Sequence, residues 1–295
     1  MNSDTSASGL LRVLNEAAAI NGVDPIGAEL VRAGSNTIYR VCDVVARIGN
    51  PGCQDTAQRE LRVSQWLNES GLRTVDVADV VHPFAVVDGR PVTWWRTIPD
   101  HRPSTPAELG GALRRLHTFV PPTTFTLPHH DPFSGLHRQI NVAGYISNDD
   151  RGWLATHLHS LREQYDDLEP MDTPRVIHGD AWQGNLVVPA DETPILLDLE
   201  RVSLGRVEWD LVQIAADYTD FARLSAIDYA AFVDSYGDDL TTHEKFRLFA
   251  DIQELRWTVF ALSQAEANTK AAAQVQLRLA CIRGDVARPW SWEAL

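Results

Sequence analysis

The sequence has too few cysteines for a disulfide framework and no cluster of them that would suit zinc. Only Cys42, Cys53 and Cys281 occur, an odd number without close spacing. A reducing compartment, the cytoplasm, is therefore expected. The chain also lacks a basic segment followed by an apolar one at its start, and it has no run of about 18 apolar residues. Secretion and membrane spanning are both disfavoured.

Basic residues are in the minority as well. The chain has 26 Lys and Arg against 40 Asp and Glu, which gives a formal net charge of −14. A nucleic acid or an anionic membrane would require a basic patch, so neither is an expected partner. The balance is compatible with a cationic substrate, although many soluble proteins are simply acidic. Oligomeric state cannot be read from the sequence.

What the chain does contain is typical of a globular protein. It has 295 residues, of which 44% are hydrophobic and 22% charged, enough for one large domain or two lobes with real cores. No internal repeat or low-complexity segment is evident.

The clearest functional pattern is a predicted β-hairpin that spans residues 185–198. Two short apolar runs flank a loop full of turn residues. A symmetric turn would place Asn185 opposite Asp198, and an amide oxygen beside a carboxylate is a donor set that Mg²⁺ accepts, with phosphate and water completing the shell. Asp180, on the loop before the hairpin, is left to orient a hydroxyl. The alternative is a hairpin with polar ends that bind nothing.

Two motifs in this stretch carry a resemblance to a known family. The residues His178-Gly179-Asp180 with Asn185, followed by Asp198-Leu199-Glu200, resemble the H-G-D-x-x-x-x-N and D-x-[DE] motifs of the aminoglycoside phosphotransferase/choline kinase-like family. The resemblance implies an α+β, protein-kinase-like fold with a small antiparallel β-rich lobe and a larger, mainly helical one. We expect a nucleotide-binding lobe at 1–97 and a catalytic and acceptor-binding lobe at 98–295.

The resemblance also implies roles for individual residues. Asp180 would be the catalytic aspartate, and His178 would shape the loop that carries it. Asn185 and Asp198 would bind the metal, while Glu200 would assist a second metal or contact the acceptor. Phosphoryl transfer depends mainly on positioning and charge neutralisation, which agrees with such a set of residues.

A turn in the first lobe is a candidate phosphate-binding loop. Short β-rich runs between residues 29 and 48 surround Gly34, Ser35 and Asn36. Backbone N–H groups and a hydroxyl in such a turn could contact nucleotide phosphates, as the glycine-rich loop of kinases does. With a single glycine, an ordinary hairpin turn is the alternative.

Arg47 stands where kinases have a lysine in the run V-A-I-K. Arginine can still contact phosphate oxygens, but as a planar fork instead of a point charge. Glu60 lies on the apolar face of a helix predicted over 54–70, so it needs a partner, and Arg47 is the natural one. The alternative for Arg47 is an edge-strand residue in solvent.

Further strands are predicted at 77–81, 84–87 and 91–98, with a hairpin turn at Asp88-Gly89. In the family the last of these runs into the hinge that binds adenine. The analogy gives five residues around the base: Val45, Arg96, Thr97, Ile98 and Val187. Trp94 and Trp95 are interpreted as core.

The rest of the chain reads as helical and acidic. His117 is expected to act as a structural hydrogen-bonding residue, and Asp210 is expected to hold the backbone of the catalytic loop. In the relatives these helices build the acceptor groove. Asp251 and Glu254, one turn apart beside Trp257, are the candidates for contact with a cation.

The sequence thus predicts a kinase that uses Mg²⁺ and ATP, or GTP, to phosphorylate a hydroxyl of an aminoglycoside-like acceptor. A kinase for a sugar or an amino-alcohol shares the same core, so it remains an alternative. A second alternative is a non-catalytic, nucleotide-binding regulatory relative, motivated by Arg47 in the lysine position.

Overall fold

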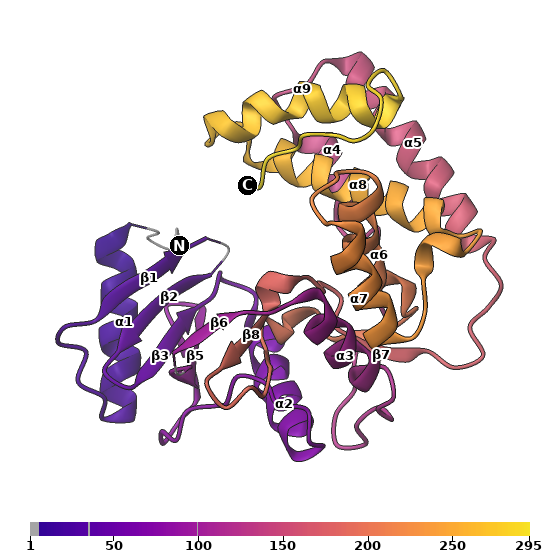
Figure 1. The fold of residues 1–295 in the computed structure, drawn as a ribbon. Coiled ribbons are helices and arrows are strands. Elements are labelled where there is room, and N and C mark those ends of the chain that lie inside the picture. The colour runs from indigo at the N-terminus through magenta and orange to yellow at the C-terminus, as the bar shows by residue number, and fades with distance from the viewer. Residues whose placement is uncertain (1–5, 35, 99) are drawn as a thin grey trace. The chain divides into compact units, whose positions relative to one another are not determined.

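The computed structural model describes residues 6–34, 36–98 and 100–295 (Figure 1). The chain forms two compact units. The first comprises Met1–Ser104, Pro122–Thr126 and Gln183–Val202, and the second comprises Thr105–Pro121, Leu127–Trp182 and Ser203–Leu295. An antiparallel sheet dominates the first and helices dominate the second, so the predicted α+β class is confirmed. The functional division at residue 97 stays a prediction.

The first unit is built on a five-stranded antiparallel sheet with the order β1-β2-β3-β5-β4. Its strands are β1 (Glu29–Ala33), β2 (Thr37–Val41), β3 (Val44–Ile48), β4 (Phe84–Val87) and β5 (Arg90–Arg96). The prediction of a strand at 77–81 is wrong. There only Val77 forms a bridge, to Trp95, because β4 already pairs with the other end of β5.

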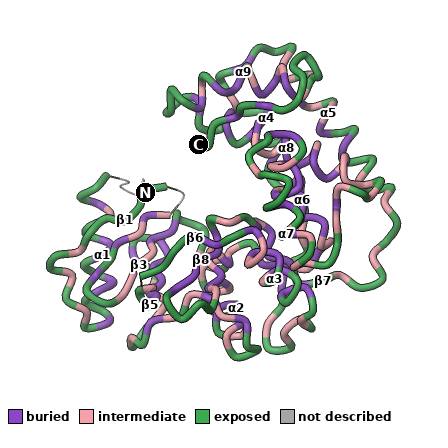
Figure 2. Tube along the Cα trace, in the orientation of Figure 1, coloured by how far each residue is buried: buried purple, intermediate pink, exposed green. Residues whose placement is uncertain are grey.

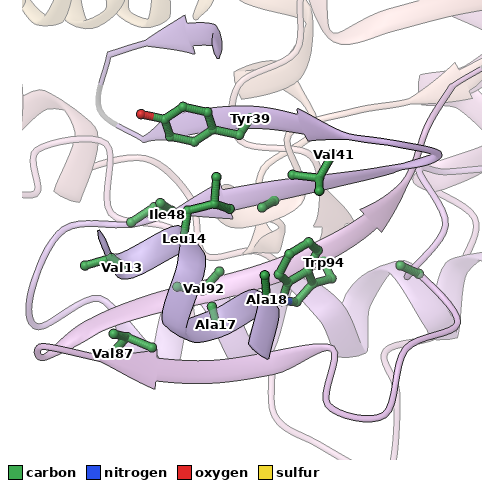
Figure 3. Packing of buried hydrophobic residues seen from close by; sticks show 12 residues of the cluster. Val13, Leu14, Ala17, Ala18, Tyr39, Val41, Ile48, Val87, Val92 and Trp94 are labelled. Atoms are coloured by element: carbon green, nitrogen blue, oxygen red, sulfur yellow. The ribbon is translucent and has the colours of Figure 1, made fainter. Parts of the chain in front are cut away.

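Helix α1 (Ala7–Asn21) covers one face of this sheet (Figure 3). Ser6 caps its start, since the Ser6 hydroxyl accepts from the Gly9 N–H, and Gly22 ends it in the left-handed conformation. Leu14 and its neighbours pack on side chains that alternate along the strands, among them Ile48 and Trp94. Trp94 is therefore core, as predicted.

The same alternation turns a second set of side chains to the opposite face of the sheet. In the β3–β5 pairing Val45 lies opposite Trp95 and Arg47 lies opposite Thr93. Helix α2 (Gln54–Glu69) packs against β5 on this side and brings the buried Glu60 to Arg47. The face away from α1 therefore carries the polar residues expected in the nucleotide site.

A smaller sheet completes the first unit. It has the order β6-β8-β9, from β6 (His101–Pro103), β8 (Leu186–Pro189) and β9 (Ile195–Leu196), so the predicted hairpin exists. Its register differs by one residue from the prediction. Leu186 pairs with Leu196, and the Leu197 N–H donates to the Asn185 carbonyl at 2.9 Å, so Asn185 lies opposite Leu197 and not Asp198.

The asymmetric loop of this hairpin explains the shift. Glu192 has a φ of 56°, and its N–H closes a turn on the Pro189 carbonyl at 3.0 Å. The Asp191 side chain then accepts from the Thr193 N–H. Glutamate seldom adopts a positive φ, so the sequence does not indicate this turn.

The second unit consists mainly of seven α-helices among its described residues. They are α3 (Pro106–Leu116), α4 (Leu136–Val142), α5 (Asn148–Asp166), α6 (Glu208–Thr219), α7 (Ala226–Tyr236), α8 (Phe246–Gln264) and α9 (Thr269–Arg283). A two-stranded pair joins β7 (Arg175–Ile177) to β10 (Ser203–Gly205). In the described part of the chain no helix combines the length and apolar character that a membrane span needs.

Gly110 on α3 permits the close packing of α3 on α7. A Cβ at this position would lie 2.6 Å from the Phe232 carbonyl oxygen, closer than real Cβ atoms approach. Buried residues of α6 and α8 form a large part of the remaining core of the second unit (Figure 2). The chain end packs on it through Trp290 and Trp292, which contact Phe221.

Candidate active site

A cavity of about 600 Å³ lies within the first unit, on the face of the sheet away from α1. Val45, Arg96, Thr97 and Ile98, four of the five residues expected around a base, line it. The fifth, Val187, is not in its described wall, because Val187 is buried in the small sheet, where it pairs with Pro103 and Ile195. The place of Val187 beside the base stays a prediction.

Several lining residues were not predicted from the sequence. Trp95 is buried like a core residue, yet its place opposite Val45 puts it in the cavity wall. The alternation of β5 was the signal that could have identified it. Strand β1 is exposed along its whole length (Figure 2) and contributes apolar side chains to the wall. The other unpredicted apolar lining residues are Leu30, Val31, Ile38, Val75 and Leu197.

Arg47 lines this cavity and is the centre of an ion-pair cluster. Its Nη1 donates to Glu60 Oε1 at 2.5 Å, which is the ion pair that the sequence predicts. Its Nη2 donates to Glu200 Oε2 at 2.7 Å and lies 3.4 Å from Asp198 Oδ1. With its amide oxygen turned to the guanidinium, Asn36 accepts from Nη2 at 2.6 Å and from Nε at 3.0 Å. Ser35 lies outside the described residues.

The Arg47–Glu60 pair is largely removed from solvent. The Arg47 side chain is 15% exposed and that of Glu60 is 4% exposed. Burial raises the pKa of Glu60 to about 7, although the charge of Arg47 lowers it. A buried carboxylate of this kind depends on its partner, so Glu60 fixes the position of the guanidinium.

Asn185 and Asp198 offer the oxygen donors of a magnesium site. Asn185, which is buried, ends the short 3-10 helix Gln183–Asn185 just before β8, and the half-buried Asp198 follows the end of β9 by two residues. Among the residues that the structure describes, no group of three or more His, Cys, Asp or Glu side chains could hold a metal ion. One amide oxygen and one carboxylate, completed by phosphate and water, fit Mg²⁺, which keeps few protein ligands. Their role as metal ligands stays a prediction.

In the second unit a buried aspartate holds the loop that carries Asp180. The N–H groups of His178 and Gly179 donate to the Asp210 carboxylate at 2.6 and 2.8 Å. His117 Nε2 bonds to the same carboxylate at 3.0 Å, and the Asp180 N–H donates to His178 Nδ1 at 3.3 Å. The structural roles expected of Asp210, His117 and His178 are therefore confirmed.

The acidic residues proposed for cation contact lie in an internal ion-pair network of the second unit. Glu254 is 1% exposed, and its carboxylate binds Arg247 at 2.6 Å and Arg288 at 2.9 Å. Asp251 pairs with Arg247 at 2.8 Å. Two arginines already compensate Glu254, so its burial and ion pairs do not favour the expected contact with a substrate ammonium group, which stays a prediction. Trp257 packs edge-to-face on Phe221.

Similar folds occur among solved structures. An amicoumacin kinase, hAmiN, solved with AMP-PNP, Ca²⁺ and Ami, superimposes with a TM-score of 0.73 at 13% identity over 93% of each chain. The spectinomycin phosphotransferase APH(9)-Ia, with ADP and spectinomycin, gives 0.64 at 13% identity over 94% of this chain and 95% of that one. A choline/ethanolamine kinase family protein from Mesorhizobium loti gives 0.63 at 18% identity, over 92% and 94%.

These likenesses and the antiparallel and helical units define a protein-kinase-like fold. No curated protein sequence matches the chain. Residues 29–249 match the model of the phosphotransferase enzyme family, APH. The chain therefore belongs to the phosphotransferase enzyme family, as the sequence motifs indicate.

Proposed function

We propose that the protein is a small-molecule kinase, which transfers the γ-phosphoryl group of a nucleoside triphosphate to a hydroxyl of an aminoglycoside-like acceptor. The observation that carries the proposal is the position of the Arg47–Glu60 pair, which meets Asp198 at the end of the cavity in the first unit. This arrangement supports binding of the base among the apolar side chains and of the phosphates at the guanidinium.

In this proposal each functional residue has one task. Arg47 binds α- and β-phosphate oxygens, and Glu60 orients its guanidinium. Asn185 and Asp198 hold Mg²⁺, which when bound neutralises charge on the phosphate oxygens. Asp180 orients the acceptor hydroxyl and accepts its proton. The nucleotide is ATP, with GTP as the alternative.

The arginine at position 47 is compatible with catalysis. Lysine occurs only twice in the chain, at Lys245 and Lys270, against 24 arginines. Arginine has thus replaced lysine almost throughout, so Arg47 need not mark the loss of a catalytic lysine. It also keeps the ion pair with the helix glutamate. A non-catalytic regulatory relative is therefore the weaker reading.

The acceptor class is proposed from the family and the charge. The similar solved structures described above include an amicoumacin kinase and a spectinomycin phosphotransferase. In addition, the formal net charge of −14 suits a cationic acceptor. A choline/ethanolamine kinase family protein and the choline kinase LicA are also similar, so amino-alcohols and sugars remain alternative acceptors. A role in antibiotic resistance follows only from an antibiotic acceptor.

An assay of ADP or GDP release tests the proposal across aminoglycosides, amino-alcohols and sugars in the presence of Mg²⁺. We expect release stimulated by one acceptor class, and loss of that stimulation in Asp198→Ala. Nucleotide binding without stimulated release by any acceptor would favour the regulatory alternative. Stimulated release that is equal in Asp198→Ala would remove the metal-binding role.

A further inference from the structure

The guanidinium of Arg47 makes contacts that a lysine could not make. It faces Glu60 through Nη1, Glu200 and Asp198 through Nη2, and Asn36 through Nε and Nη2. A lysine ammonium has three N–H donors, whereas the guanidinium has five in a rigid plane. Arg47 therefore connects the turn that carries Asn36 to the hairpin segment that carries Asp198 and Glu200.

Negative charge exceeds positive charge in this cluster. Three carboxylates, those of Glu60, Asp198 and Glu200, lie within 2.5, 3.4 and 2.7 Å of one guanidinium. Because the Arg47 side chain is only 15% exposed, water screens these charges incompletely. The phosphates of a nucleotide would bring further negative charge, so Asp198 and Glu200 oppose their approach to Arg47.

Glu200 also occupies an N–H donor of Arg47 that could otherwise bind a phosphate oxygen. Its Oε2 accepts from Nη2, the nitrogen that lies nearest to Asp198 as well. Glu60 and Arg47 line both the large cavity and a small polar one of about 20 Å³, and Glu200 lines only the small one. The Glu200 carboxylate thus binds the guanidinium from the wall of the small cavity, outside the described lining of the large one.

We propose that Glu200 makes nucleotide binding depend on the divalent cation, by competing with phosphate oxygens for Arg47. This inference rests on the proposed function, because it takes Arg47 as the phosphate-binding residue. A divalent cation bound at Asp198 offsets the negative charge and relieves the competition. Coupling between two binding equilibria is reciprocal, so the nucleotide strengthens cation binding by the same factor.

Calorimetric titration of wild type and Glu200→Gln with ATP, in EDTA and in MgCl₂, tests this coupling. Titrations use GTP if wild type does not bind ATP. In EDTA the variant is expected to bind nucleotide roughly fivefold or more tightly than wild type, within the usual range of coupling. The increase in nucleotide affinity that MgCl₂ produces should then be smaller in the variant than in wild type by about the same factor.

Glu192→Gln is the matched control. Glu192 lies in the loop of the hairpin, in the same unit as Glu200, and pairs with the exposed Arg102 at 2.5 Å. It does not line either cavity. Replacement of Glu192 by glutamine removes the same charge from the first unit as Glu200→Gln does. The control should nevertheless bind nucleotide with the affinity of wild type, both in EDTA and in MgCl₂. An equal gain in EDTA for both variants would show a general charge effect and overturn the proposal.

The other outcomes separate this inference from the proposed function. If wild type binds nucleotide in MgCl₂ and Glu200→Gln binds no more tightly than wild type in EDTA, the coupling role is overturned and the kinase proposal stands. If wild type binds neither ATP nor GTP in MgCl₂, the proposed function itself fails. If Glu200→Gln does not fold, Glu200→Asp is used instead. This variant keeps the negative charge but weakens the contact with Arg47 Nη2, so we expect a smaller increase in nucleotide affinity in EDTA. No increase over wild type would overturn the proposal.

Discussion

Replacement of Asp180 by alanine is expected to lower kcat by roughly 10²–10⁴-fold, the usual contribution of a positioned general base. The backbone of its loop is held by the Asp210 carboxylate and by His178, through N–H groups that alanine retains. The loop should therefore keep its conformation. Steady-state kinetics with the best acceptor and a titration with nucleotide measure the two properties separately.

Asp172→Ala is the control for this variant. Asp172 is exposed and lies on the segment that leads into β7, so its removal changes the net charge equally. We expect Asp172→Ala to keep the wild-type kcat. An Asp180→Ala protein that binds nucleotide and turns over at the wild-type rate would exclude the role given to Asp180.

Replacement of Asp210 by asparagine is expected to destabilise the second unit by about 3–5 kcal/mol, the cost of breaking a buried charged network by removing one partner. Asp210 is 1% exposed and accepts hydrogen bonds from His178 and Gly179 and bonds to His117. An asparagine would present its NH₂ group to some of the groups that donate to the Asp210 carboxylate. At least one buried N–H would then lack a hydrogen-bond acceptor. The melting temperature should fall by roughly 6–20 °C.

The effect of Asp210→Asn should depend on pH. Burial alone would raise the pKa of Asp210, but the hydrogen bond and charge of His117 and the contacts with His178 lower it below its ordinary value. A carboxyl whose pKa is lower in the folded state stabilises the fold above its unfolded pKa, and this contribution is lost as pH falls. The difference in stability between wild type and Asp210→Asn should therefore be largest near pH 7 and become smaller below about pH 4.

Asp234→Asn provides the comparison, because Asp234 is exposed on α7. Its melting temperature should stay within about 1–2 °C of wild type, as for most surface substitutions. Equal melting temperatures for Asp210→Asn and wild type near pH 7 would show that the buried carboxylate does not hold the catalytic loop.

Local patterns allowed much of the fold to be predicted. The strands from β1 to β3 follow short runs rich in β-branched residues, and α1 ends at Gly22 where its pattern stops. The Arg47–Glu60 pair was predictable because a carboxylate on an apolar helix face requires a partner. The role of Asp210 in holding the loop backbone was expected from the resemblance to the family and not from local patterns.

What could not be predicted depends on geometry that residue types do not encode. The hairpin register depends on the positive φ of Glu192, which glutamate rarely adopts. The compensation of Glu254 by Arg288 joins residues 34 positions apart on separate segments, so sequence spacing gives no sign of it.

Transfer of labelled phosphate tests the central claim most directly. The protein is incubated with γ-labelled ATP or GTP, MgCl₂ and the acceptor that most stimulates nucleoside diphosphate release, and the products are separated. The account predicts label on a hydroxyl of the acceptor with wild type, and none above background with Asp180→Ala or Asp198→Ala. Label found only as inorganic phosphate, or equal labelling of the acceptor by all three proteins, would contradict it.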